Sequence, residues 1–157
     1  MFNKYYFQKK NSAGLTMIEL LIVIGITMLL AGVSSVVYGN LQTSTQLNET
    51  ASQVAQNLRL VKEQSISGFN NTAHGIKFET SRYTLYQGDS YATRDSSYDR
   101  IYSFASALNV STTLINNEIN FSKGVGVFNA TGTVIIDHLA GGTKIIFIDD
   151  NGMIKEQ

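Results

Sequence analysis

Residues 13–38 decide the fold, and they read AGLTMIELLIVIGITMLLAGVSSVVY. The run from Leu15 to Tyr38 holds 24 residues, and Glu19 is its single charged residue. An α-helix rises about 1.5 Å per residue, so a helix of this length spans the roughly 30 Å hydrocarbon core of a bilayer. We therefore predict a membrane helix over residues 15–38.

Charged residues on either side of the apolar run predict its orientation. Lys4, Lys9 and Lys10 precede it without any acidic residue, whereas the first basic residue after it is Arg59. Basic flanks favour the cytoplasmic side of a membrane. We expect the N-terminus in the cytoplasm and the rest of the chain, from residue 39 onward, outside.

A pair of small residues, Ala13-Gly14, stands between the lysines and the apolar run. In a secretory signal peptide the small-residue cleavage site follows the apolar region instead. Ala31-Gly32 is a later pair that resembles such a cleavage site, and cleavage there stays open as an alternative. The order of the segments favours a short leader, residues 1–14, that ends before the helix.

Residues 13–24 resemble the type III signal of type IV pilins and type II secretion pseudopilins, whose usual form is G-F-T-L-I-E-L-L. Leu15 replaces the usual Phe and Met17 a usual Leu. The matching residues are Gly14, Thr16, Ile18, Glu19, Leu20 and Leu21. The resemblance implies that a prepilin peptidase cleaves between Gly14 and Leu15, and that the new amine of Leu15 is methylated.

Glu19 is a carboxylate inside an apolar helix, where an unpaired charge costs free energy. No Lys or Arg lies within two helical turns of it after cleavage, so its own chain offers no cation except the Leu15 amine. The family resemblance implies pairing with the amine of a neighbouring subunit during assembly. The alternative is a carboxylate that reaches the headgroups at the cytoplasmic interface.

Residues 39–67 are polar overall but keep one apolar stripe, which predicts that the helix continues. A two-heptad coiled-coil seam is the competing interpretation. We expect the stripe to face a sheet instead, and it consists of Leu47, Ala51, Val54, Leu58 and Val61.

From residue 68 to 157 the pattern changes to short alternating runs divided by turn residues, which predicts an antiparallel β-rich head. Residues 75–79 and 82–87 read as a hairpin, residues 88–99 as a surface loop, and residues 105–117 are ambiguous. Further strands are expected at residues 100–104, 118–128 with a bend at 124–126, 133–137, 143–149 and near Met153, with a turn at Asp150-Asn151-Gly152. The expected class is α+β, with a long N-terminal helix packed on an antiparallel sheet.

The composition offers little to catalysis. The chain has no Cys, which excludes thiolate chemistry and cysteine metal sites. His74 and His138 lack a carboxylate or second His at metal-ligand spacing, so both are interpreted as structural or surface residues. Asp149, Asp150 and Asn151 are weak candidates for Ca2+, because an Asp-rich turn before Gly needs no ion. We expect a non-enzymatic protein without a cofactor.

Nucleic acid is a rival ligand, since Arg82, Arg94 and Arg100 alternate along the chain with tyrosines that include Tyr83, Tyr91 and Tyr98. Binding to phosphates needs a basic patch. The negative charges of Asp89, Asp95 and Asp99 lower the net positive charge of this one. Beyond Tyr38 nine basic and eleven acidic residues leave a net charge of −2. The alternative function is accordingly a single-pass membrane-anchored binding domain that captures DNA and does not polymerise.

The whole pattern of long helix, hairpin, loop and closing strands is similar to the GspH/FimT-like class of minor pilins and pseudopilins. This resemblance implies a minor subunit of a type IV pilus or a type II secretion pseudopilus. Its partners would be the prepilin peptidase, other pilin or pseudopilin subunits, membrane lipid and the inner-membrane assembly platform. The subunit would start in the bacterial inner membrane and end in a filament at the cell surface or in the periplasm.

Overall fold

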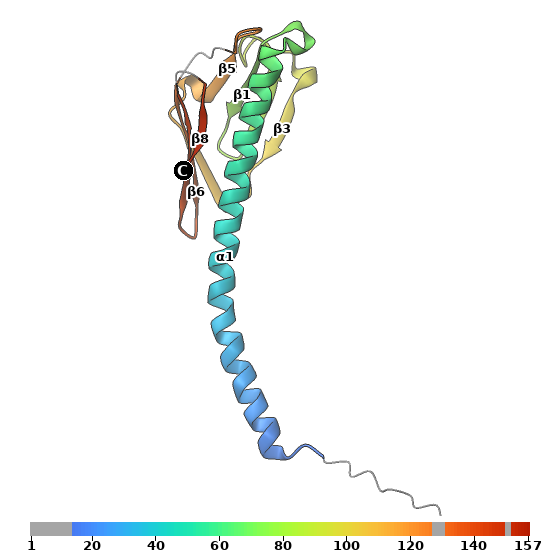
Figure 1. Ribbon diagram of the computed structural model, residues 1–157, viewed down its shortest axis with the longest axis vertical. Helices are drawn as coiled ribbons and strands as arrows, with labels where there is room; N and C mark the ends of the chain where they lie inside the picture. The colour runs from blue at the N-terminus through green and yellow to red at the C-terminus, as the bar shows by residue number, and fades with distance from the viewer. Residues whose placement is uncertain (1–13, 127–130, 150–151) are drawn as a thin grey trace, which may run out of the picture. The chain divides into compact units, whose positions relative to one another are not determined.

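A single helix, α1, runs from Met17 to Ile66 in the computed structural model of the protein (Figure 1). The structure describes residues 14–126, 131–149 and 152–157, without the side chains of residues 33–37. The chain has no Pro to interrupt the helix. The helix ends where Gly68 takes a left-handed conformation, with φ 64°. The predicted continuity of the helix from the apolar run into residues 39–67 is confirmed.

Residues 1–39 and residues 40–157 form two separate compact units. Among the residues that the structure describes, no helix has both the length and the apolar character needed to cross a membrane.

Two four-stranded antiparallel sheets build the head. Their strand orders are β3-β2-β1-β5 in the first sheet and β4-β6-β7-β8 in the second. The strands are β1 (His74–Phe78), β2 (Arg82–Gln87), β3 (Arg100–Ser103), β4 (Leu108–Thr112), β5 (Glu118–Phe121), β6 (Gly132–His138), β7 (Thr143–Ile148) and β8 (Ile154–Glu156). Short 3-10 turns lie at η1 (Phe69–Asn71), η2 (Ser96–Tyr98) and η3 (Ile115–Asn117).

Most of the predicted strands are confirmed, including the β1–β2 hairpin, in which Gly75 pairs with Tyr86. The ambiguous range 105–117 contains β4 and η3. The prediction of one strand over residues 118–128 is wrong, because β5 stops at Phe121. Gly124 and Gly126 have φ of 79° and 66°, which takes the backbone out of the extended region. Residues 127–128, and Asp150 and Asn151 of the predicted turn, lie outside the described residues.

The head was expected to hold one sheet, and η3 explains why it holds two. The strands before and after it belong to different sheets, since β4 pairs with β6 whereas β5 pairs with β1. Asn116 and Asn117 both have positive φ, at 53° and 52°. Asn tolerates this conformation better than most residues, and these two reverse the chain between the sheets.

One core joins the two sheets to the second half of α1. The predicted apolar stripe of the helix is buried in full, with exposed fractions between 0 and 5 %. Ala55 is also fully buried, which widens the stripe beyond the predicted 4-3-4-3 spacing. The core includes sheet residues from both layers, among them Ile76, Phe78, Leu85, Ile119, Val134, Ile136 and Ile146.

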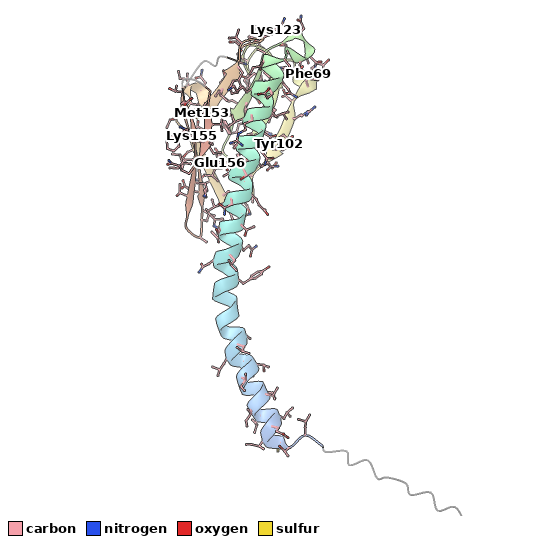
Figure 2. The ribbon with its side chains drawn as sticks, in the orientation of Figure 1. Phe69, Tyr102, Lys123, Met153, Lys155 and Glu156 are labelled. Carbon is pink, nitrogen blue, oxygen red and sulfur yellow. The ribbon has the colours of Figure 1, made fainter. Side chains whose placement is uncertain are left out.

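Polar contacts attach the last strand to the helix. Arg59 donates from Nη2 to the carbonyl oxygen of Ile154 at 3.3 Å and lies 3.5 Å from the Glu156 carboxylate. Lys62 Nζ donates to the carbonyl oxygen of Gly152 at 3.1 Å. Figure 2 shows Glu156 beside the second half of the helix. These bonds hold the C-terminal end of the chain on α1.

Candidate functional site

The predicted processing junction lies just before the first turn of α1. Gly14 is exposed, and a Cβ built on it would meet no atom within 4 Å. Leu15 has an exposed fraction of 78 %. The backbone on both sides of the Gly14-Leu15 peptide bond is therefore accessible, as attack by a second protein requires.

Thr16 and Glu19 form a capping box at the start of the helix. The Glu19 carboxylate oxygen Oε2 accepts from the Thr16 backbone N–H at 3.0 Å and from its hydroxyl at 2.9 Å. The Glu19 N–H donates in turn to Thr16 Oγ1 at 3.2 Å. This reciprocal pattern satisfies N–H groups that the first turn of a helix leaves without partners. The carboxylate also lies at the positive end of the helix dipole.

The sequence offered Glu19 no cation except the future Leu15 amine, and it left the hydrogen bonds from Thr16 unpredicted. Glu19 has hydrogen-bond donors from Thr16, although no cation. The sequence signal was present, because Thr-x-x-Glu before an apolar run is the pattern of a capping box. The capping-box pattern shares Thr16 and Glu19 with the cleavage signal. The same two residues can serve both.

Beyond the cap, most of the side chains described as far as Leu30 are large and apolar. Each large one described between Leu15 and Leu30 is at least 43 % exposed in the single chain. Soluble monomers rarely show an apolar surface of this extent. Such a surface is suited to burial against lipid or against another apolar surface.

The two histidines differ in their surroundings. His74 is 2 % exposed, on β1, and His138 lies half-buried at the end of β6 with Nε2 3.0 Å from Gln46 Oε1. Within the described ranges, no three His, Cys, Asp or Glu side chains gather closely enough to hold a metal ion. Asp149 accepts from the backbone N–H of Met153 at 2.8 Å. Its predicted companions, Asp150 and Asn151, lie outside the described residues.

The predicted cation-aromatic face forms only in part. The Arg94 guanidinium stacks 3.6 Å from the centre of the Tyr91 ring, but its Nε also binds Asp99 at 2.9 Å. Arg82 pairs with Glu79. Placing Tyr83 on this face was wrong, because Tyr83 is 1 % exposed and packs between Phe78 and Tyr102. With two of its three arginines paired to carboxylates, the face offers little free positive charge to phosphates.

Comparison with known proteins finds a match to the N-terminal motif and matches to the fold of the head. Residues 9–35 match the model of the prokaryotic N-terminal methylation motif. The minor pseudopilin EpsH from the type 2 secretion system of Vibrio cholerae is 14 % identical, over 71 % of this chain and 96 % of EpsH, with a TM-score of 0.53. The type IV minor pilin FimU of Pseudomonas aeruginosa is also 14 % identical, over 73 % of this chain and 90 % of FimU, with a TM-score of 0.59.

No curated protein matches the chain. At these identities the two structures show that the head shares their fold. The methylation motif is a separate observation, made on a part of the chain that ends at residue 35. The chain thus carries the prokaryotic N-terminal methylation motif in residues 9–35, and its head has the fold of these two minor subunits, one a type IV pilin and one a type II secretion pseudopilin.

Proposed function

We propose that the protein is a non-enzymatic minor subunit of a type IV pilus or a type II secretion pseudopilus, of the GspH/FimT-like class. The observation that carries the proposal is an accessible Gly14-Leu15 bond placed directly before a capped helix that exposes large apolar side chains from Met17 to Leu30. The fold of the head supports the minor class, because both compared structures are minor subunits.

Processing begins with removal of residues 1–14 by a prepilin peptidase. Hydrolysis of the Gly14-Leu15 amide leaves a carboxylate on Gly14 and an amine on Leu15, which is then methylated. This amine stands one residue before Thr16, whose N–H lies 3.0 Å from Glu19 Oε2. The new positive charge therefore forms close to a carboxylate that the capping box already holds in place.

The mature subunit rests in the inner membrane through residues 15–38. Lys4, Lys9 and Lys10 keep the leader on the cytoplasmic side, where the peptidase and the assembly platform meet it, and the head lies outside. Assembly moves the apolar helix from lipid into a bundle of equivalent helices. Glu19 sets the register there by pairing with the Leu15 amine of a neighbouring subunit.

Cleavage separates this function from its rival, a single-pass membrane-anchored domain that never polymerises. The chain is co-expressed with a prepilin peptidase, and the membrane form is measured by intact-mass spectrometry. We expect a product that begins at a methylated Leu15. A membrane form that keeps residues 1–14 in cells where a known prepilin is processed would refute the proposal.

Two matched variants separate the roles of Glu19. Glu19→Gln keeps an oxygen that accepts from the Thr16 N–H but removes the charge, whereas Thr16→Val removes the hydroxyl and keeps the charge. We expect both chains to be cleaved, Glu19→Gln to lose filament incorporation, and Thr16→Val to retain most of it. If Glu19→Gln entered filaments as well as the natural chain, the charge would have no role in assembly.

A further inference from the structure

A lysine of the second sheet lies on the side that faces α1. Lys144 of β7 pairs directly with Ile136 of β6, and side chains of directly paired residues share one face of a sheet. Ile136 is fully buried, and so is Ile146, two positions further along β7. Lys144 therefore belongs to the core-facing side of the sheet, where it is half-buried. A lysine in such a place is rarely left without a partner.

Within the parts of the chain that the structure describes, no carboxylate pairs with Lys144. The salt bridges there are made by Arg59, Arg82 and Arg94. Asp137 of β6 is directly paired with Thr143, one residue away from the Ile136–Lys144 pair, so it lies on the opposite face of the sheet. Its carboxylate accepts from the Thr143 hydroxyl at 2.6 Å. The charge of Lys144 is therefore available to a ligand.

Lys144 lines a groove between α1 and the turn that joins β6 to β7 (Figure 1). The groove has a volume of about 400 Å³, which lies in the range of small-molecule sites. A Cβ built on Gly142 would lie 2.9 Å from Leu47 Cδ1, so the turn and the helix meet at this point. The helix wall carries one amide and two hydroxyls, on Asn40, Thr43 and Ser44.

The groups that line the groove select an anion. Among the described residues that line it, Lys144 carries a charge and none carries a carboxylate. The side chains of Asn40 and Ser44 have donors for the same anion. A phosphate group accepts several such bonds and attracts the ammonium of a lysine. The ammonium of a zwitterionic headgroup would find no carboxylate there, so a phosphate diester with a net negative charge fits this groove better.

The position of the groove along α1 favours a membrane lipid over a free phosphate. The proposed membrane segment ends at Tyr38, and Asn40 and Ser44 follow it within six residues. At about 1.5 Å per residue they lie about 3–9 Å beyond that end, at the level of a headgroup layer about 5–8 Å thick. Leu41 on the helix and Leu139 at the turn are 61 % and 77 % exposed. Exposed leucines beside phosphate-binding groups suit a ligand with acyl chains.

We propose that this groove, which we call the Lys144 groove, binds the phosphate of an anionic membrane phospholipid. Lys144 pairs with a phosphate oxygen, Asn40 and Ser44 donate to the others, and the acyl chains pass the two exposed leucines. The inference rests on the proposed function through the membrane placement of residues 15–38. It does not depend on cleavage after Gly14 or on assembly.

Backbone 1H–15N spectra of the full, uncleaved chain provide the test. The chain is held in an amine-oxide detergent, which carries no phosphate, and is titrated with dioctanoyl phosphatidylglycerol. We expect the amides of Gly141, Gly142 and Lys144 to shift saturably. Dioctanoyl phosphatidylcholine has the same chains without the net charge, and we expect it to bind about fivefold more weakly or less. Glycerol 3-phosphate has no acyl chains and should leave these amides unshifted at the concentration at which phosphatidylglycerol saturates them.

Two variants that each remove one positive charge locate the binding. Lys144→Gln should weaken the binding of phosphatidylglycerol by about fivefold, the effect of one lysine at an anionic surface. Lys155 is exposed on β8 and pairs with Phe147, which belongs to the outer face of the same sheet. We expect Lys155→Gln to change the affinity by less than about twofold.

The proposal is overturned if phosphatidylglycerol leaves the three amides unshifted, or if phosphatidylcholine binds as tightly. It is also overturned if glycerol 3-phosphate saturates the amides at the same concentration, which would indicate a site for free phosphate, or if the two lysine variants bind alike. None of these results bears on processing at Gly14, which intact-mass spectrometry measures separately.

Discussion

Leu58→Ala measures how firmly the head is seated on the helix. Leu58 is 0 % exposed and belongs to the core that joins both sheets to α1. Truncating a leucine in such a place removes its burial and leaves a cavity, at a cost of about 2–5 kcal/mol. We expect about 3 kcal/mol here, because two layers of sheet surround the site and limit its collapse.

Leu60→Ala is the matched control, on the same helix two residues away. Leu60 is 39 % exposed, so the same truncation should cost less than about 1 kcal/mol. The change in helix propensity from Leu to Ala is the same for both, which leaves burial as the difference. Urea unfolding of the full chain in zwitterionic detergent, followed by near-ultraviolet circular dichroism of the tyrosines, provides the assay.

At a slope of about 1.5–2 kcal/mol per M of urea, we expect the midpoint to fall by about 1.5–2 M for Leu58→Ala. The midpoint should fall by less than about 0.7 M for Leu60→Ala. Equal shifts for the two variants would refute the reasoning, because the stability of the head would then not depend on the buried stripe.

Two further predictions concern the first sheet. Gly75→Ala should destabilise the head by about 1–3 kcal/mol in the same urea assay, because a Cβ there would lie 2.3 Å from the Tyr86 ring and 2.7 Å from the Ile119 carbonyl oxygen. Tyr86→Leu relieves only the contact with the ring, and an unchanged urea midpoint for Gly75→Ala in the natural background would contradict this cause. Burial raises the pKa of Tyr83 and of Tyr86 to about 12. The folded head therefore favours the neutral phenols, whose contribution to stability is present below about pH 10 and is lost as the pH rises toward 12. We expect a loss of about 2–3 kcal/mol at most for each group. Urea midpoints between pH 9 and pH 12 check this loss, which Tyr86→Phe should reduce by about half; an unchanged loss in that variant would count against the assignment.

Periodicity predicted those parts of the fold that depend on neighbours in the sequence. The stripe from Leu47 to Val61 repeats at helical spacing, so its burial follows from the order of the residues alone. The β1–β2 hairpin joins strands that are adjacent in the chain, with Glu79 to Ser81 between them. In both cases the pattern that predicts the element lies within a short stretch of sequence, although the stripe is buried by distant residues of both sheets.

The division into two sheets depends on contacts between distant residues. β4 alternates buried and exposed residues as a strand should, but Asn109, Ser111 and Thr112 blur its apolar signal. Its partner β6 begins at Gly132, and the partner of β5 is β1, which ends at Phe78. No short window of sequence contains either pair, so the pattern predicted strands without their pairing.

The same contrast, between residues adjacent in sequence and residues that only the fold brings together, separates the processing junction from the surroundings of His74. The proposed processing junction can be inferred from sequence alone because a peptide bond and its flanking signal are contiguous in the chain. The residues around His74 come from α1, β1, β2, η2 and β3. His74 was interpreted as structural or surface because its nearest residues in the sequence offer no chemistry, and only the fold brings Gln64, Gln87 and Arg100 to it.

The capping box changes how the proposed role of Glu19 should be understood. Both donors from Thr16 meet one carboxylate oxygen, Oε2, whereas a carboxylate has room for about four donors over its two oxygens. Pairing with a neighbouring Leu15 amine therefore does not require the cap to break. Thr16 instead fixes the direction of the carboxylate before any partner arrives, so less conformational freedom is lost when the subunits meet. If Glu19 pairs with that amine as proposed, the capping box preorganises its carboxylate for assembly, and the first turn of the helix need not unfold when the subunit joins.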